Sequence, residues 1–60
     1  MVKYRAMCDD TNLGEFDTKK EAQICIQEDK KAMRKQYMKT QKELDNLFTW
    51  DIDTIEIIYQ

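Results

Sequence analysis

The chain has 60 residues, of which 42% are hydrophobic and 37% charged, and its net charge at neutral pH is −2. A chain of this length buries only about 60% of the surface that it exposes when unfolded, which excludes two independent domains and predicts one small domain, residues 1–60. No apolar run approaches the roughly 18 residues needed to span a bilayer, so we expect no membrane association.

The first predicted element is a β-strand over residues 2–8. Apolar residues at positions 2, 4, 6 and 8 alternate with Lys3, Arg5 and Met7, which is the pattern of a half-buried strand. The polar residues 9–12 have side chains that favour turns, so they predict a hairpin leading into a short second strand at residues 13–16.

A helix is predicted to begin at Thr18, because residues 18–21 read TKKE and match the S/T-x-x-E capping box. Its apolar stripe is interrupted by Asp29, Gln36 and Thr40. A helix over residues 18–46 would be roughly 40 Å long, whereas a seven-residue strand covers about 23 Å. We therefore expect that the helix breaks near Thr40 or that its far end packs on something else, such as a second copy. The stripe contains Ala22, Cys25, Ile26, Met33, Tyr37, Leu44 and Leu47.

The sequence becomes rich in β-branched residues after Trp50, which predicts a third strand. We expect Ile55, Ile57 and Tyr59 to face the helix and Ile58 to lie on the opposite side of the sheet. A right-handed crossover predicts that this strand runs antiparallel to the first. The predicted fold class is α+β: a ββαβ chain whose three-stranded antiparallel sheet, order 2-1-3, packs on one long amphipathic helix.

Catalytic and metal sites are poorly supported by the composition. The chain has no histidine and no serine, which excludes Ser-His and Cys-His nucleophile arrangements. Cys8 and Cys25 are too few for a closed zinc site, and we expect both to be reduced and buried. A single glycine without a GK[ST] pattern provides no phosphate-binding loop. We therefore expect a protein that is not an enzyme, with no catalytic residue, metal or cofactor.

The cellular location is expected to be the cytoplasm, or the host cytoplasm if the gene belongs to a phage. The first residues, MVKYR, do not resemble the apolar segment of a secretion signal.

Residues 13–22, LGEFDTKKEA, resemble the strand-to-helix junction of the AP2-type plant domains and of the arm-binding domains of phage integrases, which read LGxFDTxxEA. The resemblance implies a three-stranded sheet that binds the DNA major groove with a helix behind it. This chain departs from those families because its third strand follows the helix. It also lacks their Arg- and Trp-rich strands and has only Lys3 and Arg5, which leaves the DNA contacts without their usual residues.

Charge is distributed unevenly along the chain. Residues 1–18 carry −2, residues 19–42 carry +5 and residues 43–60 carry −5. This segregation predicts separate basic and acidic surfaces that bind a partner. The candidate residues are Lys31, Arg34, Lys35 and Lys42 for an acidic partner site, and Glu43, Asp45, Asp51 and Asp53 for a basic one.

Binding by surface is the function that the composition leaves open. The prediction is a small non-catalytic binding protein, of the kind found as phage or mobile-element accessory proteins, that inhibits or regulates a host protein by direct contact. If the helix extends past the sheet, a second copy of the chain is the simplest partner for its far end, which would make the protein a homodimer. The alternative is a nucleic-acid-binding module that uses the basic helix face.

Overall fold

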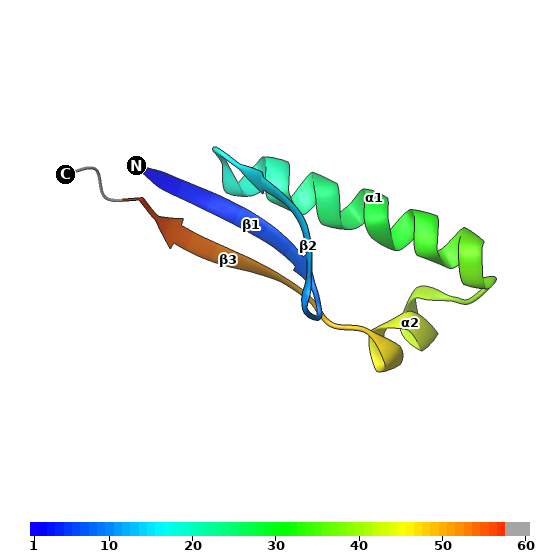
Figure 1. Ribbon diagram of the computed structural model, residues 1–60. Coiled ribbons are helices and arrows are strands. Elements are labelled where there is room, and N and C mark those ends of the chain that lie inside the picture. Colours follow the sequence, from blue (N-terminus) through cyan, green and yellow to red (C-terminus); the bar gives the residue numbers. More distant parts are fainter. Residues whose placement is uncertain (58–60) are drawn as a thin grey trace.

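The computed structural model describes residues 1–57 and contains three strands and two helices (Figure 1). The strands form one antiparallel sheet in the order β2-β1-β3, and α1 lies across one face of it. The predicted α+β class and strand order are therefore confirmed, with a short second helix added between α1 and β3. The elements are β1 Val2–Cys8, β2 Thr11–Phe16, α1 Lys19–Tyr37, α2 Gln41–Leu47 and β3 Trp50–Glu56.

The β1-β2 hairpin turns more tightly than the sequence predicted. Only Asp9 and Asp10 form the turn, so β2 begins at Thr11, which pairs with Cys8. Asp9 adopts a left-handed backbone conformation (φ 51°) that aspartate tolerates better than most residues. Two hydrogen bonds hold the hairpin tip against the segment before β3: the Asp9 N–H donates to the Thr49 carbonyl (2.7 Å), and the Thr49 N–H donates to Asp9 Oδ1 (3.0 Å).

Helix α1 begins where the capping box predicted. The Thr18 hydroxyl accepts a hydrogen bond from the Glu21 N–H (3.2 Å). The helix ends at Tyr37, because Met38 adopts the left-handed conformation (φ 54°). Thr40 then caps α2, so of the two outcomes that the helix length left open, the break near Thr40 is the one that the structure shows.

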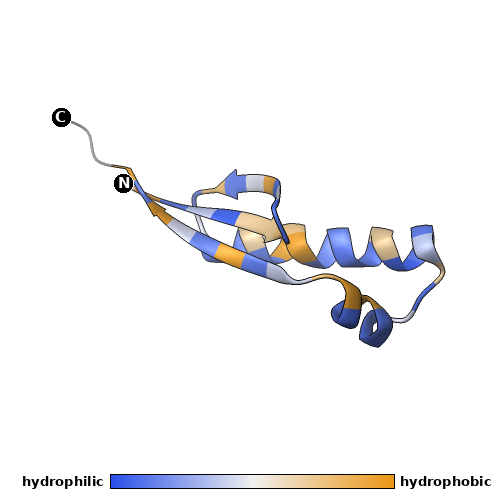
Figure 2. Cartoon of the chain, turned by 60° about the horizontal axis from the view of Figure 1, so that its bottom comes forward, coloured by the Kyte–Doolittle hydropathy of each residue, from blue (hydrophilic) through white to orange (hydrophobic). Residues whose placement is uncertain are grey.

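The core is small and divided between the two halves of α1. Ala22 and Ile26, from its first half, pack with Ala6 of β1 and are buried. Beyond the sheet, α2 packs on α1 and contributes Leu44, which is completely buried. Figure 2 shows how few apolar positions the second half of α1 contains.

The register of β3 corrects the predicted facing of this strand. Ile52 pairs with Ala6 and packs on the core, so alternation places Ile55, which pairs with Lys3, on the outer face of the sheet. The expectation that Ile55 faces the helix was wrong, because Trp50 and Ile52 fill that side instead. Ile57 follows the last residue of β3, so the strand register does not assign it to a face. The predictions for Ile58 and Tyr59 lie outside the described residues.

The molecule is elongated rather than spherical. Its radius of gyration is 13.0 Å, whereas about 10 Å is expected for a compact chain of this length. The excess arises because the end of α1 and all of α2 extend beyond the sheet (Figures 1 and 2). We call residues 33–48 the distal end.

Within residues 1–57, no helix has the length and apolar character required to cross a membrane.

Candidate functional site

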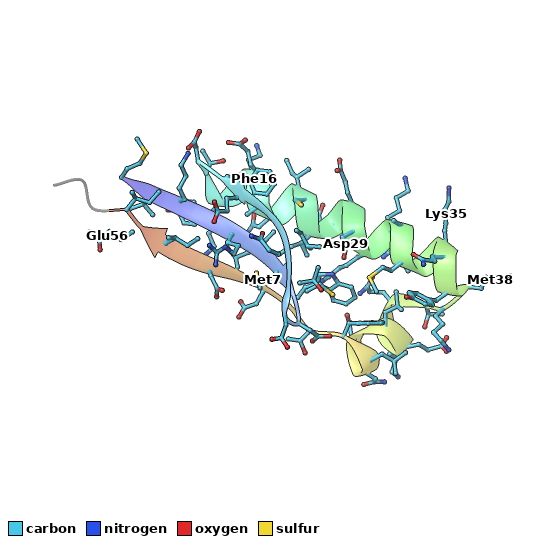
Figure 3. The ribbon with its side chains drawn as sticks, in the orientation of Figure 1. Met7, Phe16, Asp29, Lys35, Met38 and Glu56 are labelled. Atoms are coloured by element: carbon cyan, nitrogen blue, oxygen red, sulfur yellow. The ribbon has the colours of Figure 1, made fainter. Side chains whose placement is uncertain are left out.

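The predicted basic residues of α1 lie together on its outer side. Lys31, Arg34 and Lys35 are exposed, and Figure 3 shows Lys35 pointing away from the sheet. Arg34 Nη1 donates to Gln41 Oε1 (2.9 Å), so this side chain also ties α1 to α2. Lys31 and Lys35 make no side-chain hydrogen bond or ion pair within the part of the chain that the structure describes. Lys42 is exposed on α2, which adds a fourth cation near this end of the molecule.

The predicted acidic residues do not form one surface. Glu43 belongs to the cap of α2: its carboxylate accepts from the Thr40 N–H (3.2 Å), while its own N–H donates to the Thr40 hydroxyl (3.3 Å). The hydrogen bonds that the Thr40 N–H and the Thr40 hydroxyl donate to this carboxylate, and to a lesser extent the charge of Lys39, hold the pKa of Glu43 below its ordinary value. Asp45 accepts from Gln41 Nε2 (2.7 Å) within the same helix. Both residues therefore have local roles in α2.

The other two predicted acids, Asp51 and Asp53, lie on the outer face of the sheet. The alternation that turns Ile52 inward places both of them there. The two cations of the same face are already neutralised, because Lys3 forms an ion pair with Asp17 and Arg5 Nη2 lies 2.6 Å from Glu15 Oε1. The face that the DNA-binding resemblance would assign to phosphate contacts therefore carries an excess of negative charge.

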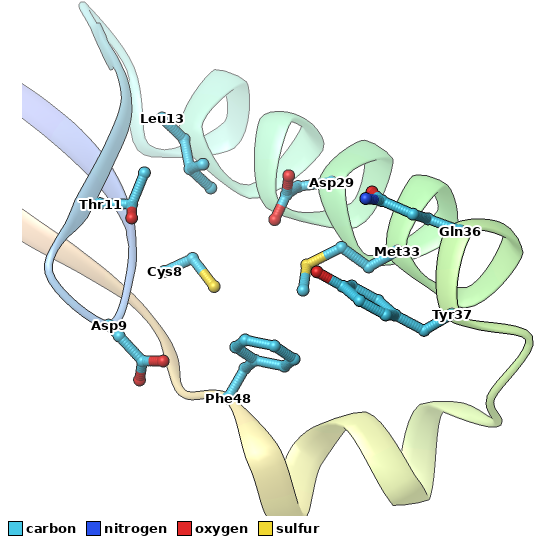
Figure 4. A pocket seen from close by; sticks show the side chains of 9 residues that line it. All are labelled: Cys8, Asp9, Thr11, Leu13, Asp29, Met33, Gln36, Tyr37 and Phe48. Atoms are coloured by element: carbon cyan, nitrogen blue, oxygen red, sulfur yellow. The ribbon is translucent and has the colours of Figure 1, made fainter.

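A cleft that the sequence did not predict opens between the hairpin tip, the second half of α1 and the segment before β3 (Figure 4). Its volume is about 280 Å³. This volume is just below the range of about 300–1,000 Å³ that is usual for small-molecule sites. The residues that shape it are Cys8, Asp9, Asp29, Met33, Tyr37 and Phe48.

Aromatic rings form a continuous row beside this cleft. The ring centroids of Tyr37 and Phe48 are 6.1 Å apart, and those of Phe48 and Trp50 are 6.0 Å apart. The indole Nε1 of Trp50 donates to Asp29 Oδ2 (2.9 Å), and Lys30 Nζ lies 5.2 Å from the centroid of the Trp50 ring. The row links the end of α1 to the start of β3 and fixes one wall of the cleft.

The two cysteine thiols, of which only Cys8 lines the cleft, are unsuited to nucleophilic chemistry. Both are free; Cys8 is buried, as expected, whereas Cys25 is only half-buried and its Sγ donates to the Leu13 carbonyl. Burial raises the pKa of both thiols, and the negative charge of Asp29 raises it further. Both thiols are therefore protonated at neutral pH, and a protonated thiol is a poor nucleophile.

No group of three or more Cys, Asp or Glu side chains in residues 1–57 is arranged to hold a metal ion. The described side chains do present charges, aromatic rings and exposed apolar groups at the surface.

The distal end exposes large apolar side chains that the sequence did not single out as binding residues. Met38 is 91% exposed, Leu47 59% and Tyr37 46%. Figure 3 shows Met38 projecting from the tip of the molecule, beyond the last turn of α1. Tyr37 also lines the cleft, so the exposed apolar residues and the cleft are adjacent.

No protein-family model matches the sequence, and no characterised protein or solved structure is significantly similar to it.

Proposed function

We propose that the chain is a non-catalytic protein-binding module that acts through its distal end, as a small accessory protein of a phage or mobile element that inhibits or regulates a host protein in the cytoplasm. Met38 is the observation that carries this proposal. Its side chain is 91% exposed and its backbone is left-handed, a conformation in which helix ends normally place glycine or asparagine. A large apolar residue here contributes almost nothing to packing and strains the backbone, so contact with another protein is the role that accounts for it.

The surroundings of Met38 have the composition of a protein interface. Met, Tyr and Arg are enriched at such interfaces, and exposed apolar groups surrounded by polar ones mark interaction sites. Tyr37 and Leu47 are exposed near this end, and Arg34 and Lys35 lie on the last turns of α1. The elongated shape also favours a binding role for the distal end, because a bound partner would cover apolar surface that the small core leaves exposed.

Crosslinking and affinity capture with full-length tagged protein test this proposal. The informative variant is Met38→Asn, because asparagine removes the apolar side chain yet tolerates the left-handed backbone, so folding is preserved. The matched control is Ile24→Asn, since Ile24 is 47% exposed on the first half of α1, away from the distal end. We expect a stoichiometric partner with the wild type and the control, and at least a tenfold weaker complex with Met38→Asn. Equal capture by both variants would refute the assignment to the distal end.

Nucleic-acid binding is the second candidate, because Lys31 and Lys35 are exposed on one helix face without ion pairs in the described part of the chain. A basic helix of this kind can follow a phosphate backbone. The negative charge on the outer face of the sheet weighs against DNA binding through the strands. Salt-dependent retention on duplex DNA that disappears in the Lys31→Glu/Lys35→Glu double variant would favour this function. No retention at low salt would eliminate it.

A second copy of the chain is the simplest partner. Pairing of two copies through their β3 edge strands is disfavoured. If two β3 strands paired antiparallel over all seven residues, the central residue of each, Asp53, would lie opposite its counterpart, and like charges opposite each other are destabilising. If the distal end is the binding surface, as proposed above, a homodimer would form through it. Sedimentation measurements over a hundredfold concentration range decide the matter: a mass that rises to twice the monomer value supports self-association, and a constant monomer mass excludes it.

A further inference from the structure

We infer that the cleft in Figure 4 binds the guanidinium group of an arginine side chain from the partner protein. This inference rests on the proposed function, since it names the chemistry of one contact in the complex. It depends on the charge of the cleft, on the shape of its walls and on its size.

The side chains that line the cleft carry a net negative charge, and a neighbouring cation, Lys30, lies over the Trp50 ring and outside the lining. Asp9 and Asp29 both line the cleft, and no lysine or arginine is among the residues that do. Asp29 is half-buried, and the only hydrogen bond to its carboxylate within residues 1–57 comes from the neutral indole N–H of Trp50. A half-buried carboxylate without a cation is costly, and a cationic group entering from outside would complement both acids.

The walls of the cleft favour a flat cation over a spherical one. Figure 4 shows Asp29 on α1 and Asp9 at the hairpin tip, with the rings of Tyr37 and Phe48 among the other side chains that line the cleft. A guanidinium group stacks on aromatic faces and forms paired hydrogen bonds with carboxylates, whereas an ammonium group is more strongly hydrated. The thioether of Met33, also in the wall, can pack along the methylene stem of an arginine.

The size of the cleft suits one side chain. A volume of about 280 Å³ is below the usual range for small-molecule sites, yet it accommodates a guanidinium group and its stem. The Thr49 N–H donates to the Asp9 carboxylate and the Trp50 indole N–H donates to the Asp29 carboxylate, so both carboxylates are positioned before binding. Preorganisation of this kind reduces the entropic cost of ordering the site when the ligand arrives.

The test is a titration of the ¹⁵N-labelled full-length protein with N-acetyl-arginine amide, followed by two-dimensional NMR. We expect saturable shifts of the Trp50 indole N–H and of the amides of residues that line the cleft, with a dissociation constant on the order of millimolar. N-acetyl-citrulline amide, which has nearly the same shape without the charge, should produce no saturable shift.

Two isosteric variants and one control make the test specific. Asp29→Asn keeps an oxygen that can accept from Trp50, and Asp9→Asn keeps an acceptor for Thr49 and tolerates the left-handed backbone, so both should fold. Each should weaken arginine binding about tenfold, while Asp51→Asn on the outer face of the sheet should leave it unchanged. Shifts of equal size with citrulline, full binding by both cleft variants, or shifts centred on Asp51 and Asp53 would each overturn the inference.

The outcome is separable from that of the capture experiment. If the wild type does not bind N-acetyl-arginine amide but still captures a partner in a Met38-dependent way, this inference is wrong and the proposed function stands. If the wild type binds N-acetyl-arginine amide saturably but captures no partner, the cleft binds arginine and the proposed function is wrong.

Discussion

The indole Nε1 of Trp50, the first residue of β3, donates a 2.9 Å hydrogen bond to Oδ2 of Asp29 in the middle of α1. This contact joins residues that are 21 positions apart and holds the start of β3 under the helix at the point where the sheet ends. It also orients the carboxylate that gives the cleft its charge. One hydrogen bond thus connects the stability of the fold with the geometry of the candidate site.

Replacement of Trp50 by Phe tests the structural part of this connection. The variant keeps an aromatic ring but removes the donor, so Asp29 becomes a half-buried carboxylate without a hydrogen-bond partner among residues 1–57. We expect a loss of about 1–3 kcal/mol in the free energy of unfolding, measured by urea denaturation followed by circular dichroism. Asp29→Asn, which retains an acceptor, should lose much less. Equal loss in the two variants would show that the charge of Asp29, and not the hydrogen bond, is what matters.

Local signals in the sequence were sufficient to predict the strands, their order and the start of α1. The TKKE motif at residues 18–21 gave the correct N-cap residue, Thr18, because the cap depends only on neighbouring side chains. The same motif recurs as TQKE at residues 40–43, where it starts α2. This second motif predicts that a new helix starts at Thr40. It therefore favours a helix that breaks near Thr40 over one continuous helix that extends past the sheet.

The cleft could not be predicted, because it depends on tertiary register. The position of Asp29 on the apolar stripe was visible in the sequence, yet nothing local indicates that Trp50 is its partner. The predicted facing of β3 was wrong for the same reason. Alternation divides the residues of a strand between two faces, but the pairing of Ile52 with Ala6 decides which of the two faces packs on the helix. Likewise, the acidic residues 43–53 are adjacent in sequence but are divided between a helix cap and the outer face of the sheet.

The capping box of α2 leads to a second prediction. Thr40→Ala removes the hydroxyl that accepts from the Glu43 N–H, and loss of such a cap costs about 1 kcal/mol. The loss should be concentrated in α2, so hydrogen exchange of the amides of residues 41–47 should accelerate more than that of β1. Lys42→Ala, on the exposed side of the same helix, serves as the control and should leave exchange nearly unchanged.

The stability contribution of the same cap is predicted to depend on pH. Hydrogen bonds from Thr40 hold the pKa of Glu43 below its ordinary value of 4.5, so the folded state favours the ionised carboxylate. The contribution is therefore complete above about pH 5.5 and is lost as the pH falls through 4.5 toward the folded-state pKa. In urea denaturation, the stability difference between the wild type and Glu43→Gln should shrink as the pH is lowered from 7 to 3. A difference that is constant across this range would contradict the prediction.

The packing of α2 depends on Leu44, whose side chain is completely buried. Leu44→Ala should cost about 2–5 kcal/mol, because it would leave a cavity where α2 packs on α1, and Leu44 is the buried residue that α2 contributes. The total stability of a chain of this size is roughly 3–5 kcal/mol, so we expect the variant to be largely unfolded or to lose α2. Circular dichroism and dispersion of the NMR spectrum distinguish these outcomes. The exposed Leu47→Ala is the control and should remain folded.

The left-handed backbone at Met38 gives the prediction that links stability with binding. Asparagine tolerates this conformation better than methionine does, and improved helix caps typically raise the free energy of unfolding by about 0.5–2 kcal/mol. Met38→Asn should therefore be more stable than the wild type, as measured by thermal or urea denaturation, while binding its partner less tightly. Met38→Leu keeps both the apolar side chain and the strain, so its stability and its binding should match those of the wild type. A Met38→Asn protein that is less stable than the wild type would mean that the methionine serves the fold, which would remove the reason to place it in an interface.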